Sequence, residues 1–219
     1  MYKERTKVID KNEKQKCINK ITEYFKKAID LGYDCVHFDG SNFSLEENTK
    51  LTKEIVKYAH KKEVLVEGEI KSIKGSSEIH KKTSKLDKTA FEDTGLAKEF
   101  VRKTKIDSLA INIGNVHGVY NKPIKLDIDR LKEINKNVPV FLVLHGGSGT
   151  NKNNLRQAIK LGIVKININT ELRIAWKKSL IKSLKKNTVK PYKILPPVIE
   201  AISDLVQEKI EFFRSINKN

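Results

Sequence analysis

The sequence is poor in cysteine, arginine and long apolar runs, and each shortage removes a class of protein. Among its 219 residues there are two cysteines, Cys17 and Cys35, one on each side of a predicted helix. Such a pair is not a disulfide framework, so we expect a reducing, cytoplasmic environment. No apolar run reaches the about 18 residues that a membrane span needs, so no membrane partner is expected. The N-terminal stretch is charged throughout, which is not the pattern of a secretory signal.

Charge of one sign dominates the chain, but it does not indicate a nucleic-acid partner. Basic residues outnumber acidic ones by 44 to 27, which gives a net charge of +17, and only six of the 44 are arginine. Nucleic-acid sites rely on arginine for bidentate contacts, and here the lysines are spread along every predicted helix. We therefore expect no nucleic-acid partner, although a positive field still attracts phosphorylated substrates.

Short β-branched apolar runs alternate with helical patterns along the chain. This alternation predicts an α/β fold with a parallel sheet and right-handed crossovers. The near-continuous apolar character of the runs predicts strands that are covered on both faces. The expected strands are Asp34–Gly40, Val64–Ile70, Ser108–Gly114, Pro139–Gly146 and Ile163–Asn169. The expected helices are Ile18–Leu31, Leu45–His60, Phe91–Lys103, Asp129–Asn135, Asn153–Leu161 and Pro196–Ile216.

The number of predicted strands is too small for a complete (β/α)8 barrel. Such a barrel needs about 250 residues, whereas the predicted strands all fall between Asp34 and Thr170. The first 33 residues are too few for three more strand–helix units. We therefore expect either an open sheet or an incomplete barrel.

Two histidines follow predicted strands, and each is followed by glycine. They are His117, in GNVHGVY, and His145, in VLHGGSG. Neutral imidazole is a common zinc ligand, and neighbouring parallel strands bring their ends together. Either histidine alone would be an ordinary turn residue, but the pair favours a metal site. His37 lies in the middle of a strand, and we interpret it as a packing residue rather than a ligand.

Two glycine- and asparagine-rich segments follow the last two predicted strands. Gly146, Gly147, Ser148 and Gly149 precede one helix, and residues 167–170 precede the next. Backbone N–H groups in such loops approach anions, and a hydroxyl adds a donor. The GGSG sequence alone could be a tight turn. Its coupling with the NINT sequence one unit later predicts a phosphate site after the last two strands of a barrel.

Two carboxylates also lie at strand ends. Asp39 and Glu69 could be metal ligands, bases or helix caps, and Asp39 could cap the helix that begins near Leu45. Glu67 and Glu69 share one face of their strand, so one of them could be structural.

Taken together and in this order, these motifs resemble the class II fructose-bisphosphate aldolases and the related tagatose-bisphosphate aldolases. The resemblance covers FDGSNFSLEEN, the strand ending in VEGEI, DSLAINIGNVHGVY, VLHGGSGTNKNNLRQAIKLGIVKININTELRIAW and YKILPPVIEAI. It implies a TIM (β/α)8 barrel that retains about the last five strand–helix units. It also implies a single domain over residues 1–219, in which 26–219 match the barrel and 1–25 are divergent or truncated.

The resemblance further implies a zinc-dependent lyase that cleaves fructose 1,6-bisphosphate, or a related ketose bisphosphate, to dihydroxyacetone phosphate and glyceraldehyde 3-phosphate. His117 and His145 then correspond to two of three zinc histidines. Asp39 and Glu69 correspond to carboxylates that hold a displaced metal, a second divalent ion or a monovalent cation. A homo-oligomer is also expected. The implied phosphate contacts are Gly118, Gly146, Gly147, Ser148, Asn167, Ile168, Asn169 and Thr170.

The sequence departs from the family pattern in two places. An Asp-His pair, which gives the proton donor and the third zinc histidine, would be expected near Cys17 and Ile18, and neither residue type is there. Lys71 and Lys74 stand where the loop after Glu69 should carry glycines, which leaves Glu78 as the nearest counterpart of a proton-transferring glutamate. We therefore expect the chain alone to be a weak or inactive aldolase. The alternative is a remnant that binds phosphosugars or serves as a partner subunit.

Overall fold

The sheet at the centre of the molecule is parallel throughout, as the alternating pattern predicts. The computed structural model describes residues 11–81 and 90–216. Five strands lie in the order β1-β2-β4-β6-β7, and every neighbouring pair is parallel. The strands are β1 (Cys35–Asp39), β2 (Leu65–Glu69), β4 (Ser108–Ala110), β6 (Phe141–Leu144) and β7 (Ile163–Ile166). The predicted α/β class is confirmed.

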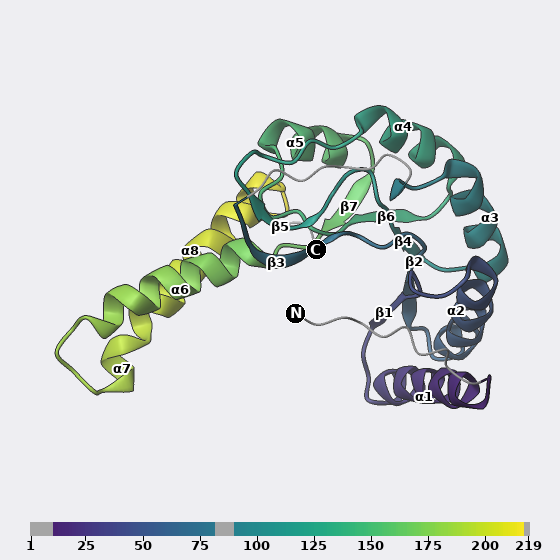
Figure 1. Ribbon diagram of the computed structural model, residues 1–219, viewed down its shortest axis with the longest axis horizontal. Coiled ribbons are helices and arrows are strands. Elements are labelled where there is room, and N and C mark those ends of the chain that lie inside the picture. Colours follow the sequence, from purple (N-terminus) through teal and green to yellow (C-terminus); the bar gives the residue numbers. More distant parts are fainter. Residues whose placement is uncertain (1–10, 82–89, 217–219) are drawn as a thin grey trace.

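Helices form an arc along the outer face of this sheet (Figure 1). The connections place α2, α3, α4 and α5 in succession along the arc, and α1 packs on α2. Helices α6 and α8 run side by side and project away from the sheet, with α7 at their far end. The bounds are α1 (Lys11–Asp30), α2 (Leu45–His60), α3 (Thr94–Thr104), α4 (Ile128–Asn137), α5 (Lys152–Lys160), α6 (Thr170–Leu184), α7 (Pro191–Ile194) and α8 (Pro196–Phe212). None of the helices in the described ranges is long and apolar enough to cross a membrane.

A second, two-stranded parallel sheet was not predicted. It joins β3 (Gly75–His80) to β5 (His117–Tyr120), and both strands lie against α6. The sequence of β3, GSSEIH, is polar and has no clear alternation, because most of its side chains are exposed. Backbone hydrogen bonds to β5, rather than side-chain burial, hold β3 in place. Its amino-acid composition is therefore that of a loop.

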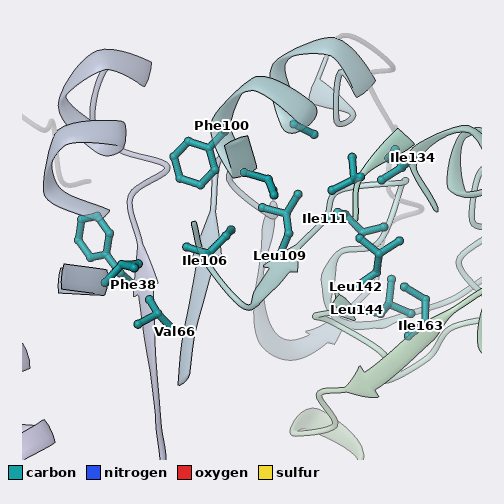
Figure 2. Close-up of a cluster of buried hydrophobic side chains, with 14 of the residues drawn as sticks. Phe38, Val66, Phe100, Ile106, Leu109, Ile111, Ile134, Leu142, Leu144 and Ile163 are labelled. Atoms are coloured by element: carbon teal, nitrogen blue, oxygen red, sulfur yellow. The ribbon is translucent and has the colours of Figure 1, made fainter. Parts of the chain in front are cut away.

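The main core lies between the outer face of the sheet and the arc of helices (Figure 2). On β1, Val36 and Phe38 are buried on this side. On β6, Leu142 and Leu144 are fully buried on the same side, and Phe100 of α3 packs in the same cluster. Burial of this apolar surface is the main stabilising term for the fold.

The inner face of the sheet carries His37, Glu67 and Glu69 beside apolar side chains such as Phe141 and Val143. Strands β1 and β7 are the two ends of the main sheet, so in the described part of the chain the barrel stays open. The prediction of strands covered on both faces fits β2 and β6, which are buried beyond their first residue. It is wrong for β1 and β7, where Cys35, Asp39 and Val164 are exposed because no further strand covers them.

The predicted boundaries of α2 are correct, and the reason is a capping box at its N-terminus. The Ser44 hydroxyl accepts a hydrogen bond from the Glu47 amide, and the Glu47 carboxylate accepts one from the Ser44 amide. These contacts satisfy two donors at the helix start. The suggestion that Asp39 caps this helix is wrong, because its carboxylate accepts instead from the Ser41 amide in the preceding turn.

Removing the Ser44 hydroxyl should destabilise the protein by a measurable amount. We expect Ser44→Ala to lower the free energy of unfolding by about 1 kcal/mol, since one helix donor loses its partner. Urea unfolding followed by circular dichroism measures this change. Ser203→Ala, an exposed serine inside α8, is the control and should not lower stability. Equal effects of the two substitutions would show that the cap contributes nothing.

Candidate functional site

Three side chains that can ligate a metal meet on the inner face of the sheet. His37 comes from β1, Glu69 ends β2, and His145 follows β6 directly. One ligand atom from each lies within 4.8 Å of the others. Two imidazoles and a carboxylate are the donor types found in zinc sites, so the group fits such an ion.

A buried carboxylate orients His145. Glu67 is 1% exposed, and its carboxylate lies 2.7 Å from His145 Nε2 and 2.7 Å from Lys165 Nζ. Burial alone would raise the pKa of Glu67, but the hydrogen bonds from His145 and Lys165 outweigh it and lower the pKa to about 2. The ionised carboxylate can only accept, so His145 donates through Nε2. In the neutral ring, the lone pair of Nδ1 is then free for a ligand.

His37 was interpreted from the sequence as a packing residue, and the structure places its ring within the metal-binding group. Its Nε2 lies 3.3 Å from Glu69 Oε2, and its ring meets that of His145 edge-on at 4.9 Å. Burial opposes the imidazolium form, but Glu69 and Glu67 outweigh this effect, so the pKa of His37 is raised. The signal that could have found it is the two-residue period of a strand, which puts His37 and Asp39 on one face.

The other two predicted metal ligands lie outside this compact group of described residues. His117 opens β5 and is half-buried, and its pKa is lowered by burial and by the nearby His145. Asp39 is exposed at the end of β1. The roles predicted for His117 and Asp39 remain predictions. Glu78, the predicted proton-transfer residue, is exposed on β3 and also lies outside the group.

The two loops predicted to hold phosphate lie next to each other. The Gly147 amide donates to the Asn167 carbonyl at 3.0 Å. The Ser148 hydroxyl accepts from the amides of Asn169 and Glu171 at 3.2 and 3.4 Å, which caps α6 from a neighbouring loop. A side chain on Gly147 would collide with Ile166 and Ile168. The loops therefore form one ordered surface at the N-terminus of α6, which is the setting expected for an anion.

The remaining predicted phosphate contacts lie around this surface. Thr170 is the first residue of α6 and is buried. Gly118 lies in β5 with a positive φ of 106°, and a side chain there would collide with the ring of His80 on β3. The structure thus gathers the predicted loop residues at one end of the sheet, while their contact with phosphate remains a prediction.

A buried carboxyl near this end of the sheet was missed by sequence reasoning. Glu92 is fully buried, and neither of its carboxyl oxygens has a hydrogen-bond partner among the described residues. Burial raises its pKa to about 8, so the side chain keeps its proton at neutral pH. No sequence pattern distinguishes Glu92 from the exposed glutamates around it.

A surface cavity of about 930 Å³ lies on the outer side of the molecule, away from these groups. It is lined by residues of α2 and α3, including Lys50, Lys53 and Lys103, and contains none of the predicted site residues. The polar cluster on the inner face is the better candidate because it combines ligand atoms with ordered loops.

The first glycine of the HGGSG loop is required for two separate reasons. Gly146 has a φ of 64°, and an added Cβ would lie 2.4 Å from the carbonyl oxygen of Val116. Gly32 has a φ of 89° but nothing within 4 Å of such a Cβ. We expect Gly32→Ala to cost about 1–2 kcal/mol for the left-handed backbone alone.

Gly146→Ala should cost roughly 1–3 kcal/mol more than Gly32→Ala, because the loop must also move away from Val116. Urea unfolding of the two variants and the parent chain measures the difference. Equal costs would show that the loop accommodates a side chain and that the approach to Val116 is not a constraint.

The buried Glu92 carboxyl predicts a pH dependence of stability. Its folded pKa of about 8 is higher than the ordinary value of 4.5. The contribution of the neutral carboxyl is therefore fully present below pH 4.5 and is lost as the pH rises to about 8. This loss amounts to about 1.4 kcal/mol per pH unit for one proton.

Glu92→Gln should abolish this dependence, so the variant should gain stability relative to the parent chain between pH 5 and 8.5. Chemical unfolding at these two pH values measures the gain. Glu54→Gln, an exposed change on α2, should follow the parent chain. Parallel behaviour of the parent chain and Glu92→Gln would rule out a neutral buried carboxyl.

Comparison with known proteins places this arrangement among sugar-phosphate aldolases. A family model described as fructose-bisphosphate aldolase class-II matches residues 15–218. The chain is 37% identical to a 6-phospho-5-dehydro-2-deoxy-D-gluconate aldolase of Shouchella clausii, over 90% of the chain and 66% of the relative. It is 38% identical to a fructose-bisphosphate aldolase of Staphylococcus aureus, over 90% of the chain and 68% of the relative.

Solved structures share the fold. The YdjI aldolase from Escherichia coli K12 superposes with a TM-score of 0.73 at 32% identity, covering 90% of this chain and 66% of that one. A fructose-bisphosphate aldolase from Campylobacter jejuni gives 0.71 at 22% identity, covering 92% and 67%, and at that identity it supports the fold alone. The chain thus spans about two thirds of the length of the proteins it matches, 66% for YdjI.

Proposed function

The chain belongs to the class II fructose-bisphosphate aldolase family, and on that premise we propose that it is a zinc-dependent lyase of ketose bisphosphates. The proposed reaction is the reversible aldol cleavage of fructose 1,6-bisphosphate, or a related ketose bisphosphate, to dihydroxyacetone phosphate and glyceraldehyde 3-phosphate. We place it in carbohydrate metabolism in the cytoplasm. The relatives' names support a phosphorylated substrate but differ in which one.

One observation carries this proposal. The metal-binding group and the two loops predicted to hold phosphate lie at the same end of neighbouring strands, because His145 is both a member of the group and the first residue of the HGGSG loop. A substrate phosphate at Gly147 and Ser148 would therefore lie close to any ion beside His145. Such an arrangement can hold a phosphorylated carbonyl compound at both ends.

The residues proposed to hold zinc are His145 and Glu69, with His117 and Asp39 as the further ligands that the family resemblance implies. When bound, zinc supplies a Lewis acid that withdraws electrons from a carbonyl oxygen. Glu67 keeps the His145 ring in one orientation and one tautomer, which is the usual role of a carboxylate behind a metal-binding histidine.

The two loops at the start of α6 are proposed to bind the phosphate. Hydrogen bonds through Ser148 and Asn167 hold these loops together, so they are ordered before a ligand arrives. The positive helix end favours an anion, and the net charge of +17 draws phosphates toward the molecule.

Proton transfer is the weak part of the proposed machinery. The resemblance would put an Asp-His pair near Cys17 and Ile18, and these positions lie within helix α1, not at a strand end. Glu78 on β3 is the remaining candidate for moving a proton. Loss of one acid–base group typically removes about 10²–10⁴-fold in rate, so we expect slow turnover by the chain alone.

A second candidate function is phosphosugar binding without turnover, either as a remnant or as a partner subunit. The ordered phosphate loops beside an incomplete catalytic set favour it. Exposed apolar side chains on the projecting α6–α8 pair, such as Trp176 and Ile199, are compatible with the homo-oligomer that we expect.

The deciding experiment is aldol cleavage of fructose 1,6-bisphosphate by the purified chain, with its zinc content measured in parallel. We expect slow turnover that a chelator abolishes and added zinc restores. His145→Ala should abolish it, since the histidine is lost from both the metal group and the loop. His60→Ala, a surface histidine paired with Asp107, is the control and should retain it.

Dihydroxyacetone phosphate binding, measured by calorimetry, separates the two candidates. Binding without turnover at any zinc concentration would favour the phosphosugar-binding protein. Turnover that persists in the chelator would contradict zinc dependence. A folded chain with neither binding nor turnover would overturn both candidates.

A further inference from the structure

The position of His37 on the inner face points to a metal site that differs from the strand-end histidine pair. We propose that the metal of this chain is held by His37 Nε2, Glu69 Oε2 and His145 Nδ1. Zinc as the expected ion rests on the proposed function, whereas the three ligands rest on the geometry of the inner face.

The spacing of the ligand atoms is already that of a tetrahedral site. With metal–ligand bonds of about 2.1 Å, two ligands of a tetrahedral zinc lie about 3.4 Å apart. Glu69 Oε2 lies 3.3 Å from His37 Nε2 and 3.6 Å from His145 Nδ1. Two of the three distances between ligand atoms are therefore close to this value. The third, between the ligand atoms of His37 and His145, is within 4.8 Å.

The atoms that would bind the ion face one another. Glu67 engages Nε2 of His145 and leaves Nδ1 on the side of Glu69. His37 Nε2 is buried and pairs with Glu69 Oε2 at 3.3 Å, without a well-aligned hydrogen bond. A metal between these two atoms would displace the imidazole proton and bind both side chains.

The charges of the group also favour a cation. Lys165 pairs with Glu67 across a 2.7 Å contact, so Glu67 is balanced by a resident charge. Glu69 is 3% exposed, and its carboxylate pairs with the imidazoles of His37 and His145. A divalent ion between them replaces weak contacts with bonds to all three side chains.

An ion held by these three side chains would have the number of protein ligands that is typical of catalytic zinc, with a further position for water or substrate. His37 would then supply a ligand from β1 besides the histidine that follows β6.

The test is a titration of the purified full-length chain with Co²⁺, followed by visible absorption, and with Zn²⁺, followed by calorimetry. We expect His37→Ala and the closer-sized His37→Gln to weaken binding of both ions by at least tenfold and to change the cobalt spectrum. His60→Ala, at the surface histidine paired with Asp107, should bind within threefold of the parent chain. Circular dichroism checks that each variant is folded.

Binding of both ions by the two His37 variants within threefold of the parent chain would overturn the proposal.

Turnover is recorded separately. Metal binding that depends on His37, without aldol cleavage, would support this site and count against the proposed lyase alone. Cleavage with metal binding that is indifferent to His37 would support the lyase and overturn this site.

Discussion

The ionised carboxylate of Glu67 is the interaction on which the inner face depends. A carboxylate that is 1% exposed must be paired, because removal of a charge from water costs several kcal/mol. Its two partners, His145 and Lys165, come from β6 and β7, which lie on the far side of β4 from its own strand. The pairing therefore ties β2 to residues of the β6 and β7 units across β4 and holds the His145 ring in one direction.

The loops after β6 and β7 connect the contacts of Glu67 with the proposed phosphate-binding end of the site. The Ser148 hydroxyl accepts hydrogen bonds from two amides at the start of α6. Asn169, at the N-cap position, makes no side-chain cap hydrogen bond. The helix is thus held by the preceding strand–helix unit. Because the same loop begins with His145, movement of that histidine would also displace the Ser148 hydroxyl and the start of α6.

Local signals made part of this molecule predictable. The apolar spacing of residues 45–60 gave the bounds of α2, and the repeated strand–helix pattern gave the parallel sheet, because both are periodic signals along the sequence. The adjacency of the HGGSG and NINT segments was predictable because parallel strands share an edge. The β3–β5 sheet was not, since backbone pairing carries no composition signal. The contact of His37 with Glu69 was missed because a strand residue was judged by its position in the strand rather than by its face.

In the open sheet, a metal held by the proposed ligands would have a structural role besides a chemical one. Strand β1 is at the end of the sheet and is paired on one side only, to β2. Edge elements open at low free-energy cost. His37 is on this strand, whereas Glu69 and His145 come from β2 and β6. An ion bound by all three would join the edge strand to the centre of the sheet, and ligands that bind only the folded state stabilise it in proportion to the logarithm of their concentration. Metal binding and the ordering of β1 are then thermodynamically coupled, so a change that destabilises the edge strand also lowers the metal affinity.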